Sequence, residues 1–267
     1  MASVAVRMKW IDCHNHLQFF GAGAAESMVA AMVAAGVVRA VVNATGEGDW
    51  EAVAALAAAY PERIVPAFGI HPWQAQEVAD RWQERLRELL GRFPQASVGE
   101  CGLDRRVAAP GVAVQGSVFL VQLRMARELR RAVTIHCVKA WGRLFEALAV
   151  EAPPPRFLLH AFGGSLETAR RLLPLGACFS CSGHLLQPRQ AAVLEVFRRL
   201  PRERILVETD APEMLPPPEQ VSHPLPENRN HPANLSAIGA GLARALGMSV
   251  GEFAELTSNN ARECFGW

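Results

Sequence analysis

Two histidines near the start of the chain, His14 and His16, are spaced so that they could bind one metal ion. In an extended segment, residues two positions apart leave the same face, so Asp12, His14 and His16 are expected on one side of a strand. Two imidazoles on one face can meet a single ion. Taken alone, the pair fits two hydrogen-bonded polar side chains equally well.

Four further residues of metal-ligand type stand at or just after the ends of short apolar runs. Glu100, His136 and His160 directly follow such runs, and Asp210 comes three residues after another. A buried histidine or a helix-capping carboxylate would explain any one of them. Their recurrence at the same relative place is what indicates a shared site.

The elements that carry these residues alternate regularly between short apolar runs and longer segments with helical spacing. This alternation is typical of repeated βα units. The expected strands cover residues 9–13, 37–43, 64–69, 96–99, 132–135, 156–159, 177–181 and 204–207. The expected helices cover residues 24–35, 49–60, 76–92, 115–131, 141–150, 166–173, 188–199, 232–246 and 249–259.

Eight such units predict a closed (β/α)8 TIM barrel, formed by one domain over residues 1–267. An open doubly wound sheet usually has a glycine-rich phosphate turn after its first strand, and none follows residues 9–13 here. Residues 212–230 are rich in proline and lack periodicity, so we expect a loop over the strand ends. Because the carboxyl ends of barrel strands converge on one mouth, the ligand-type residues predict a metal centre there.

His71 also ends an expected strand, and Pro72 follows it. It is therefore either a further ligand or part of a fixed turn that contacts the substrate. His184, His223 and His231 fall in expected loops, where we interpret them as surface or loop-ordering residues.

Composition narrows the function classes. The chain has 267 residues, is 50% hydrophobic and carries a formal net charge of +1, so no overall field would draw it to nucleic acid or to an anionic membrane. The apolar stretch 28–38 is shorter than the roughly 20 residues of a membrane span. No secretion signal is evident, so we expect a cytoplasmic protein without membrane association. The oligomeric state stays open, and a monomer is compatible with the sequence.

The combined motifs resemble the TatD family of metal-dependent hydrolases, within the amidohydrolase-like barrels. The resemblance runs along nearly the whole chain. It rests on Ile11-Asp12-Cys13-His14-Asn15-His16, Gly69-Ile70-His71-Pro72, Val98-Gly99-Glu100-Cys101-Gly102-Leu103-Asp104, Gln115, Phe119, Gln122-Leu123, His136, His160-Ala161-Phe162-Gly163-Gly164-Ser165, Glu208-Thr209-Asp210-Ala211-Pro212 and Arg229-Asn230-His231-Pro232.

The resemblance implies two divalent metal ions, with zinc, manganese, magnesium and iron all compatible with the ligands. His14, His16 and Asp210 would hold one ion, His136 and His160 would hold the second, and Glu100 would bridge them. The catalytic roles would fall to Asp210, which would take a proton from the attacking water, and to His71, which would stabilise the phosphate or leaving group. The implied activity is that of a DNase or 3′-5′ exonuclease, so the implied substrate is nucleic acid or a small phosphodiester.

Two positions depart from the pattern common in the family. Val138 stands where many relatives have an arginine, with Lys139 after it, and Glu213 stands where many have an aromatic residue. An acidic side chain near the mouth repels phosphate and removes a stacking surface for a base. One alternative is therefore hydrolysis of a carboxylic ester, amide or lactone on the same barrel. A barrel that keeps its ligands only for stability is a second alternative, which metal-dependent turnover would exclude.

Overall fold

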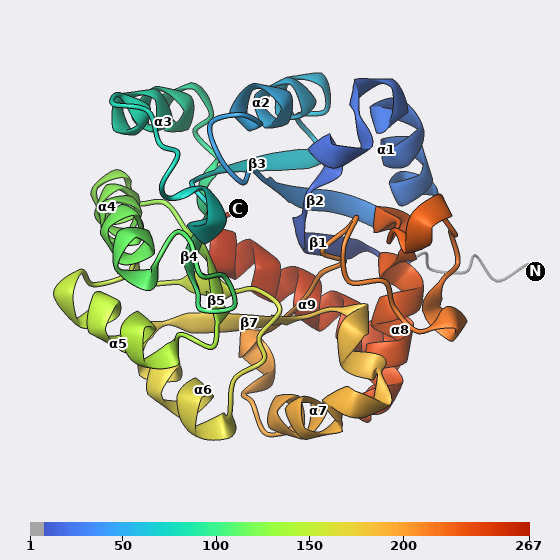
Figure 1. Ribbon diagram of the computed structural model, residues 1–267. Helices are drawn as coiled ribbons and strands as arrows, with labels where there is room; N and C mark the ends of the chain where they lie inside the picture. The colour runs from blue at the N-terminus through green and yellow to red at the C-terminus, as the bar shows by residue number, and fades with distance from the viewer. Residues whose placement is uncertain (1–7) are drawn as a thin grey trace, which may run out of the picture.

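The computed structural model describes residues 8–267 and shows eight parallel strands surrounded by helices (Figure 1). The strands pair in chain order, which confirms the predicted (β/α)8 barrel. They are β1 Trp10–Asn15, β2 Val37–Asn43, β3 Ile64–Phe68, β4 Ser97–Asp104, β5 Val133–Val138, β6 Phe157–Leu159, β7 Ala177–Cys181 and β8 Ile205–Val207.

Helices follow the strands and pack outside them. They are α1 Ala25–Ala34, α2 Trp50–Ala59, α3 Trp82–Arg92, α4 Val112–Leu129, α5 Trp141–Val150, α6 Leu166–Leu172, α7 Ala191–Arg198, α8 Leu235–Ala245 and α9 Val250–Phe265. The helices α7 and α8 begin three residues later than expected because 3-10 turns at Pro188–Gln190 and Pro232–Asn234 precede them. No helix between residues 8 and 267 has the combination of length and hydropathy that a bilayer crossing requires.

The barrel closes between β1 and the segment after β8. The N–H of Asp210 donates to the carbonyl of His14 at 2.9 Å, and the N–H of His16 donates to the carbonyl of Ala211 at 2.7 Å. The fully buried carboxylate of Asp12 accepts from the N–H and hydroxyl of Thr209 at 2.9 and 2.5 Å. The expected face of Asp12, His14 and His16 is thus divided: Asp12 joins the two ends of the sheet, and the two histidines reach the mouth.

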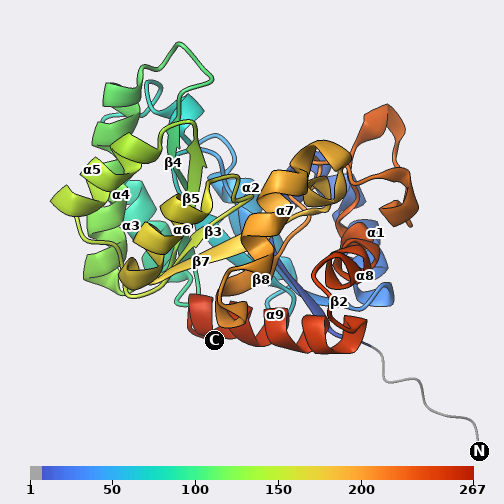
Figure 2. The ribbon, with the colours of Figure 1, turned by 90° about the horizontal axis from the view of Figure 1, so that it is seen from below.

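The helix α9 covers the opposite end of the barrel, as Figure 2 shows. Asn260 of this helix donates to the carbonyl of Ile205, the first residue of β8, at 2.8 Å. Ala261 and Cys264 pack against apolar side chains of the strands, among them Leu158 and Leu206. The helix therefore covers the amino end of the barrel, and the predicted ligand residues lie at the other end, at the strand carboxyl termini.

The strand β4 is longer than predicted, since it continues from Gly99 through Glu100 to Asp104. Glycines usually interrupt a strand, which is why the sequence suggested an end at Gly99. Here Gly102 has a φ of 140°, and a β-carbon on it would lie 2.0 Å from the carbonyl oxygen of His136 on β5. The glycine thus permits a close approach of two strands, which brings Glu100 beside His136.

We predict that Gly102→Ala lowers the free energy of unfolding by about 2 to 4 kcal/mol, because the new methyl group meets backbone that cannot rotate away. Thermal and chemical denaturation would measure the loss. Gly116→Ala in α4 is the matched control: nothing lies within 4 Å of the added β-carbon, and alanine favours helix by about 0.5 to 1 kcal/mol. Equal stability of the two variants would contradict the close approach.

Candidate metal centre

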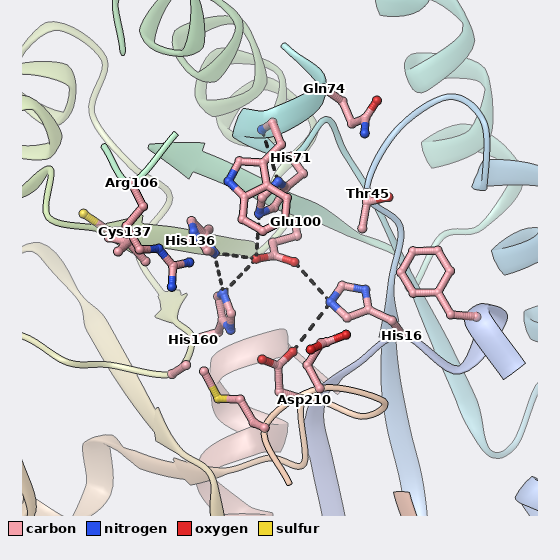
Figure 3. A pocket seen from close by; sticks show the side chains of 16 residues that line it. His16, Thr45, His71, Gln74, Glu100, Arg106, His136, Cys137, His160 and Asp210 are labelled. Carbon is pink, nitrogen blue, oxygen red and sulfur yellow. Dashed lines mark hydrogen bonds and ion pairs between the residues drawn. The ribbon is translucent and has the colours of Figure 1, made fainter. Parts of the chain in front are cut away.

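A cavity of about 580 Å³ opens at the carboxyl ends of the strands (Figure 3). Six residues predicted for the site line it or lie at its floor, and the seventh, His14, is fully buried beside them. The structure therefore brings together all the residues that the sequence singled out, namely His14, His16, His71, Glu100, His136, His160 and Asp210.

The Glu100 carboxylate lies at the centre of the cluster, as the dashed lines of Figure 3 show. Its Oε1 is 2.7 Å from Nε2 of His160 and 2.9 Å from Nδ1 of His136. Those two ring nitrogens are 3.1 Å apart. One carboxylate oxygen and two imidazole nitrogens thus converge on one point.

A second group converges on the other oxygen of Glu100. Its Oε2 is 3.3 Å from Nε2 of both His14 and His16. These two nitrogens are 3.2 Å apart and lie 3.4 and 3.6 Å from Oδ1 of Asp210. Glu100 therefore belongs to both groups, one on each side of its carboxylate.

Hydrogen bonds on the far side of two of the rings turn lone pairs toward these two points. Nδ1 of His16 is 2.8 Å from the carbonyl oxygen of Asn43, so in the neutral ring this nitrogen carries the proton and Nε2 has the lone pair. In His136 the positions are reversed, because Nε2 lies 3.2 Å from the Asp104 carboxylate and Nδ1 faces Glu100. Such outer partners typically orient metal-ligating histidines.

The donor set fits divalent cations. Nitrogen and oxygen ligands about 2.0 to 2.2 Å from one ion are about 3 to 3.5 Å from each other, close to the separations in both groups. Two lone pairs such as those of His14 and His16 repel each other at 3.2 Å unless a proton or a cation lies between them. The buried histidine and carboxylate groups are thus able to hold metal ions.

His71 is placed differently from the other histidines. The N–H of Trp73 donates to its Nδ1 at 3.1 Å, so the proton of the neutral ring sits on Nε2, which faces Glu100 at 3.6 Å. Burial lowers the pKa of His71 to about 3, so the ring is neutral at neutral pH. A protonated Nε2 offers no lone pair to a metal, and this favours the substrate-contact interpretation of His71 over a further ligand.

Charge and burial separate the two carboxylates of the cluster. Although burial opposes ionisation, the attraction of His160 and His14 holds the pKa of Glu100 well below its usual range. Burial raises the pKa of Asp210 to about 7, against the attraction of His160 and His16. Asp210 also has a left-handed φ of 53°, three residues after the end of β8, a conformation that its backbone hydrogen bond to His14 holds in place.

Two buried glutamines of α4 hold the segments that carry the site. Gln122 exchanges two hydrogen bonds with the backbone of Ile70, next to His71, at 2.7 and 3.1 Å. Gln115 does the same with the backbone of Asp104, at 2.8 and 2.9 Å. Seven residues apart, they lie on one face of the helix, so a single helix fixes two strand ends.

Sequence reasoning gave no role to Asp104 or Glu208. Asp104 bonds to His136, and the fully buried Glu208 accepts from the hydroxyl of Ser180 and faces Nδ1 of His160 at 3.8 Å. An even spacing from a predicted ligand could have indicated both residues: Asp104 is four residues after Glu100, and Glu208 is two before Asp210. Alternate residues of an extended segment share a side.

Both departures from the family pattern, Val138 and Glu213, line the cavity. Arg106 also lines it and pairs with Asp104 at 3.1 Å. The aromatic rings of Phe19 and Trp73 stand at the rim, 47% and 48% exposed. The cavity thus combines a buried polar floor with an exposed aromatic and charged rim.

The three loop histidines stay outside the cluster. His231 repeats the turn of His71, since its Nδ1 accepts from the N–H of Ala233 at 2.9 Å and Pro232 follows it. His223 bonds to Ser222, and His184 to Gln190. Their contacts agree with loop ordering.

A parallel barrel with histidines and carboxylates gathered at the carboxyl ends of its strands defines a metal-dependent hydrolase. A family model described as TatD related DNase matches residues 11–266. The 3'-5' ssDNA/RNA exonuclease TatD of Edwardsiella piscicida is 32% identical over 252 residues, which cover 91% of this chain and 94% of that protein. The protein of the same description from Pantoea ananatis is 30% identical, covering 90% of this chain and 93% of its own.

A solved structure agrees with these relatives. The crystal structure of YjjV, a TatD homolog from Escherichia coli, is similar with a TM-score of 0.87 and 29% sequence identity, covering 97% of this chain and 98% of that one. The chain belongs to the TatD family, which confirms the resemblance inferred from its motifs.

We predict that metal affinity rises with pH, by about tenfold per pH unit for each proton that an ion displaces. Although burial opposes it, hydrogen bonding and attraction to Glu100 raise the pKa of His16 to about 9. His16 is therefore protonated at neutral pH, and an ion must displace that proton; acid favours the proton and alkali favours the ion. Calorimetric titration with manganese or zinc in buffers of different ionisation enthalpy would count the released protons.

A matched pair of variants locates the effect. His16→Gln should reduce the number of released protons, whereas His223→Gln, outside the cluster, should leave it unchanged. A metal affinity independent of pH in the wild type would show that the cluster binds no ion through these rings.

Proposed function

We propose that the protein hydrolyses phosphodiester bonds of single-stranded nucleic acid from an end, with two divalent ions held in the cluster. The observation that carries the proposal is the arrangement of two ligand groups around Glu100 at the floor of an open cavity. The names of relatives that act on single-stranded DNA and RNA support the substrate class. A closed barrel mouth also admits a strand terminus more easily than the interior of a duplex.

His14, His16 and Asp210 would hold one ion, and His136 and His160 the other, with Glu100 between them. The separations in the two groups support this division. When bound, a pair of divalent cations activates water and neutralises charge on the attacked and leaving oxygens.

The side chains of this chain supply the remaining functions. Asp210, whose burial raises its pKa to about 7, accepts a proton from the attacking water. Nε2–H of His71, which lies 3.6 Å from Oε1 of Glu100 in the cavity lining, donates to a phosphate or leaving-group oxygen. The guanidinium of Arg106 adds a fixed positive charge at the cavity wall.

The rim suits an unpaired base. Phe19 stacks on His16, with ring centroids 5.5 Å apart, and the Trp73 indole N–H donates to Asp104 at 3.0 Å, so both rings are held in place. Half-exposed aromatic faces stack with any base, and each stacked base is worth about 1 to 3 kcal/mol. These two rings provide stacking surface in place of the aromatic residue that many relatives have at the position of Glu213.

We predict that Asp210→Asn lowers the turnover number by about 10² to 10⁴-fold and changes KM far less, because asparagine retains an oxygen but accepts no proton. Steady-state kinetics on an end-labelled single strand would measure both values, with metal content checked by elemental analysis. Glu219→Gln, in the same loop but outside the cavity lining, is the control. Near-normal turnover of a metal-loaded Asp210→Asn variant would place the base elsewhere.

A substrate screen with metal-reconstituted protein tests the function itself. We expect cleavage of short single strands from the 3′ end and slow cleavage of bis(p-nitrophenyl) phosphate, with duplex interiors spared. The panel should include an aminoacyl ester and a lactone, because the exposed carboxylate of Glu213 in the cavity favours a substrate without phosphate. Hydrolysis of the carbonyl substrates alone would replace the proposal with the carbonyl-hydrolase alternative.

A further inference from the structure

A second hollow, of about 310 Å³, lies on the outer side of the wall formed by the ends of β4 and β5. Three cationic side chains line it, those of Arg105, Lys139 and Arg143, together with a single carboxylate, that of Glu146. None of these four residues belongs to the metal cluster. The hollow is therefore a separate basic site next to the mouth.

The two cavities share one wall. Arg106 and Val138 line the metal cavity, while their chain neighbours Arg105 and Lys139 line the hollow. The N–H of Arg105 donates to the carbonyl of Val138 at 3.0 Å, which extends the pairing of β4 with β5 by one step. At the two strand ends, neighbouring residues therefore line opposite sides of this wall: Arg106 and Val138 face the metal cavity, and Arg105 and Lys139 face the hollow.

The positive charge of the hollow is largely uncompensated. Within residues 8–267, neither Arg105 nor Lys139 forms an ion pair, and only Arg143 does, with Glu146 at 2.7 Å. Both unpaired cations are exposed. Together they leave two positive charges without a partner beside a cavity whose own arginine, Arg106, already pairs with Asp104.

We propose that this hollow binds a backbone phosphate of the nucleic-acid strand whose end lies in the metal cavity. This proposal rests on the proposed function. Lysine and arginine side chains are the usual partners of phosphate in nucleic-acid complexes. Among the described residues, those lining the hollow include no aromatic ring that could stack with a base. The hollow therefore recognises the phosphate charge of the strand and not its base sequence. Because the two cavities share a wall, one strand can reach both of them.

The test compares a long and a short substrate. In the metal-loaded protein, replacing both Arg105 and Lys139 by alanine should raise KM for a single-stranded oligonucleotide by about tenfold or more and reduce the slope of log affinity against log salt by about 1 to 2. Hydrolysis of bis(p-nitrophenyl) phosphate, which cannot span the wall, should stay unchanged. Glu146→Gln should act in the opposite direction and lower KM, because it removes the one carboxylate of the hollow.

Arg92→Ala is the matched control, an exposed arginine at the end of α3 that lies away from the mouth. Unchanged KM and salt slope in the double variant would overturn the proposal, and so would an equal loss on the small substrate. Fluorescence anisotropy of a labelled oligonucleotide gives a readout without turnover. If no phosphodiester is cleaved but the double variant still binds the oligonucleotide more weakly, the hollow stands and the proposed chemistry fails.

The hollow could instead bind free inorganic phosphate, which has the same chemistry as a backbone phosphate. Calorimetric titration with inorganic phosphate would distinguish it: phosphate binding lost in the double variant, with oligonucleotide affinity unchanged, would overturn the proposal in favour of a small-anion site.

Discussion

The buried carboxylate of Glu100 is the constraint on which the rest of the site depends. A carboxylate removed from water costs several kcal/mol unless opposite charge and hydrogen bonds replace its hydration. Here the replacement comes from His14 on β1 and His16 directly after it, from His136 on β5 and from His160 directly after β6, each within 3.3 Å of its oxygens. Only a closed sheet brings these separate strands around one point. The barrel thus permits the buried charge, and the buried charge requires a cation or protons beside it.

The rings around Glu100 are oriented from outside the cluster. His16 is held by a backbone carbonyl and His136 by Asp104. His14 and His160 differ, since the buried Nδ1 of each has no hydrogen-bond partner among residues 8–267; their two rings instead stack on each other, with centroids 4.0 Å apart. Preoriented rings lose little rotational freedom when a metal binds, so these outer contacts raise affinity without touching the ion.

The alternation of apolar runs and helical segments predicted the barrel, and the residues at the run ends predicted the cluster, because both depend on local periodicity. The full length of β4 could not be predicted in this way. Gly99 and Gly102 indicate a strand end by propensity, yet the structure uses Gly102 for contact with β5, a partner 34 residues away in sequence. The role of Asp104 and the opposite directions of Arg105 and Arg106 depend on that extension. They required the register of two strands, which a single sequence does not contain.

The near-neutral net charge of the chain hides a local excess of positive charge beside the mouth of the barrel. Some arginines of the outer helices pair with carboxylates, as Arg87 does with Glu128 and Arg127 with Glu151. Arg105 and Lys139 have no such partner in the described part of the chain. Surface charges are screened beyond about 8 to 10 Å at physiological salt, so these two cations act on an anion only at close range. In the proposed function, a strand held by so few phosphate contacts would dissociate readily after each cleavage.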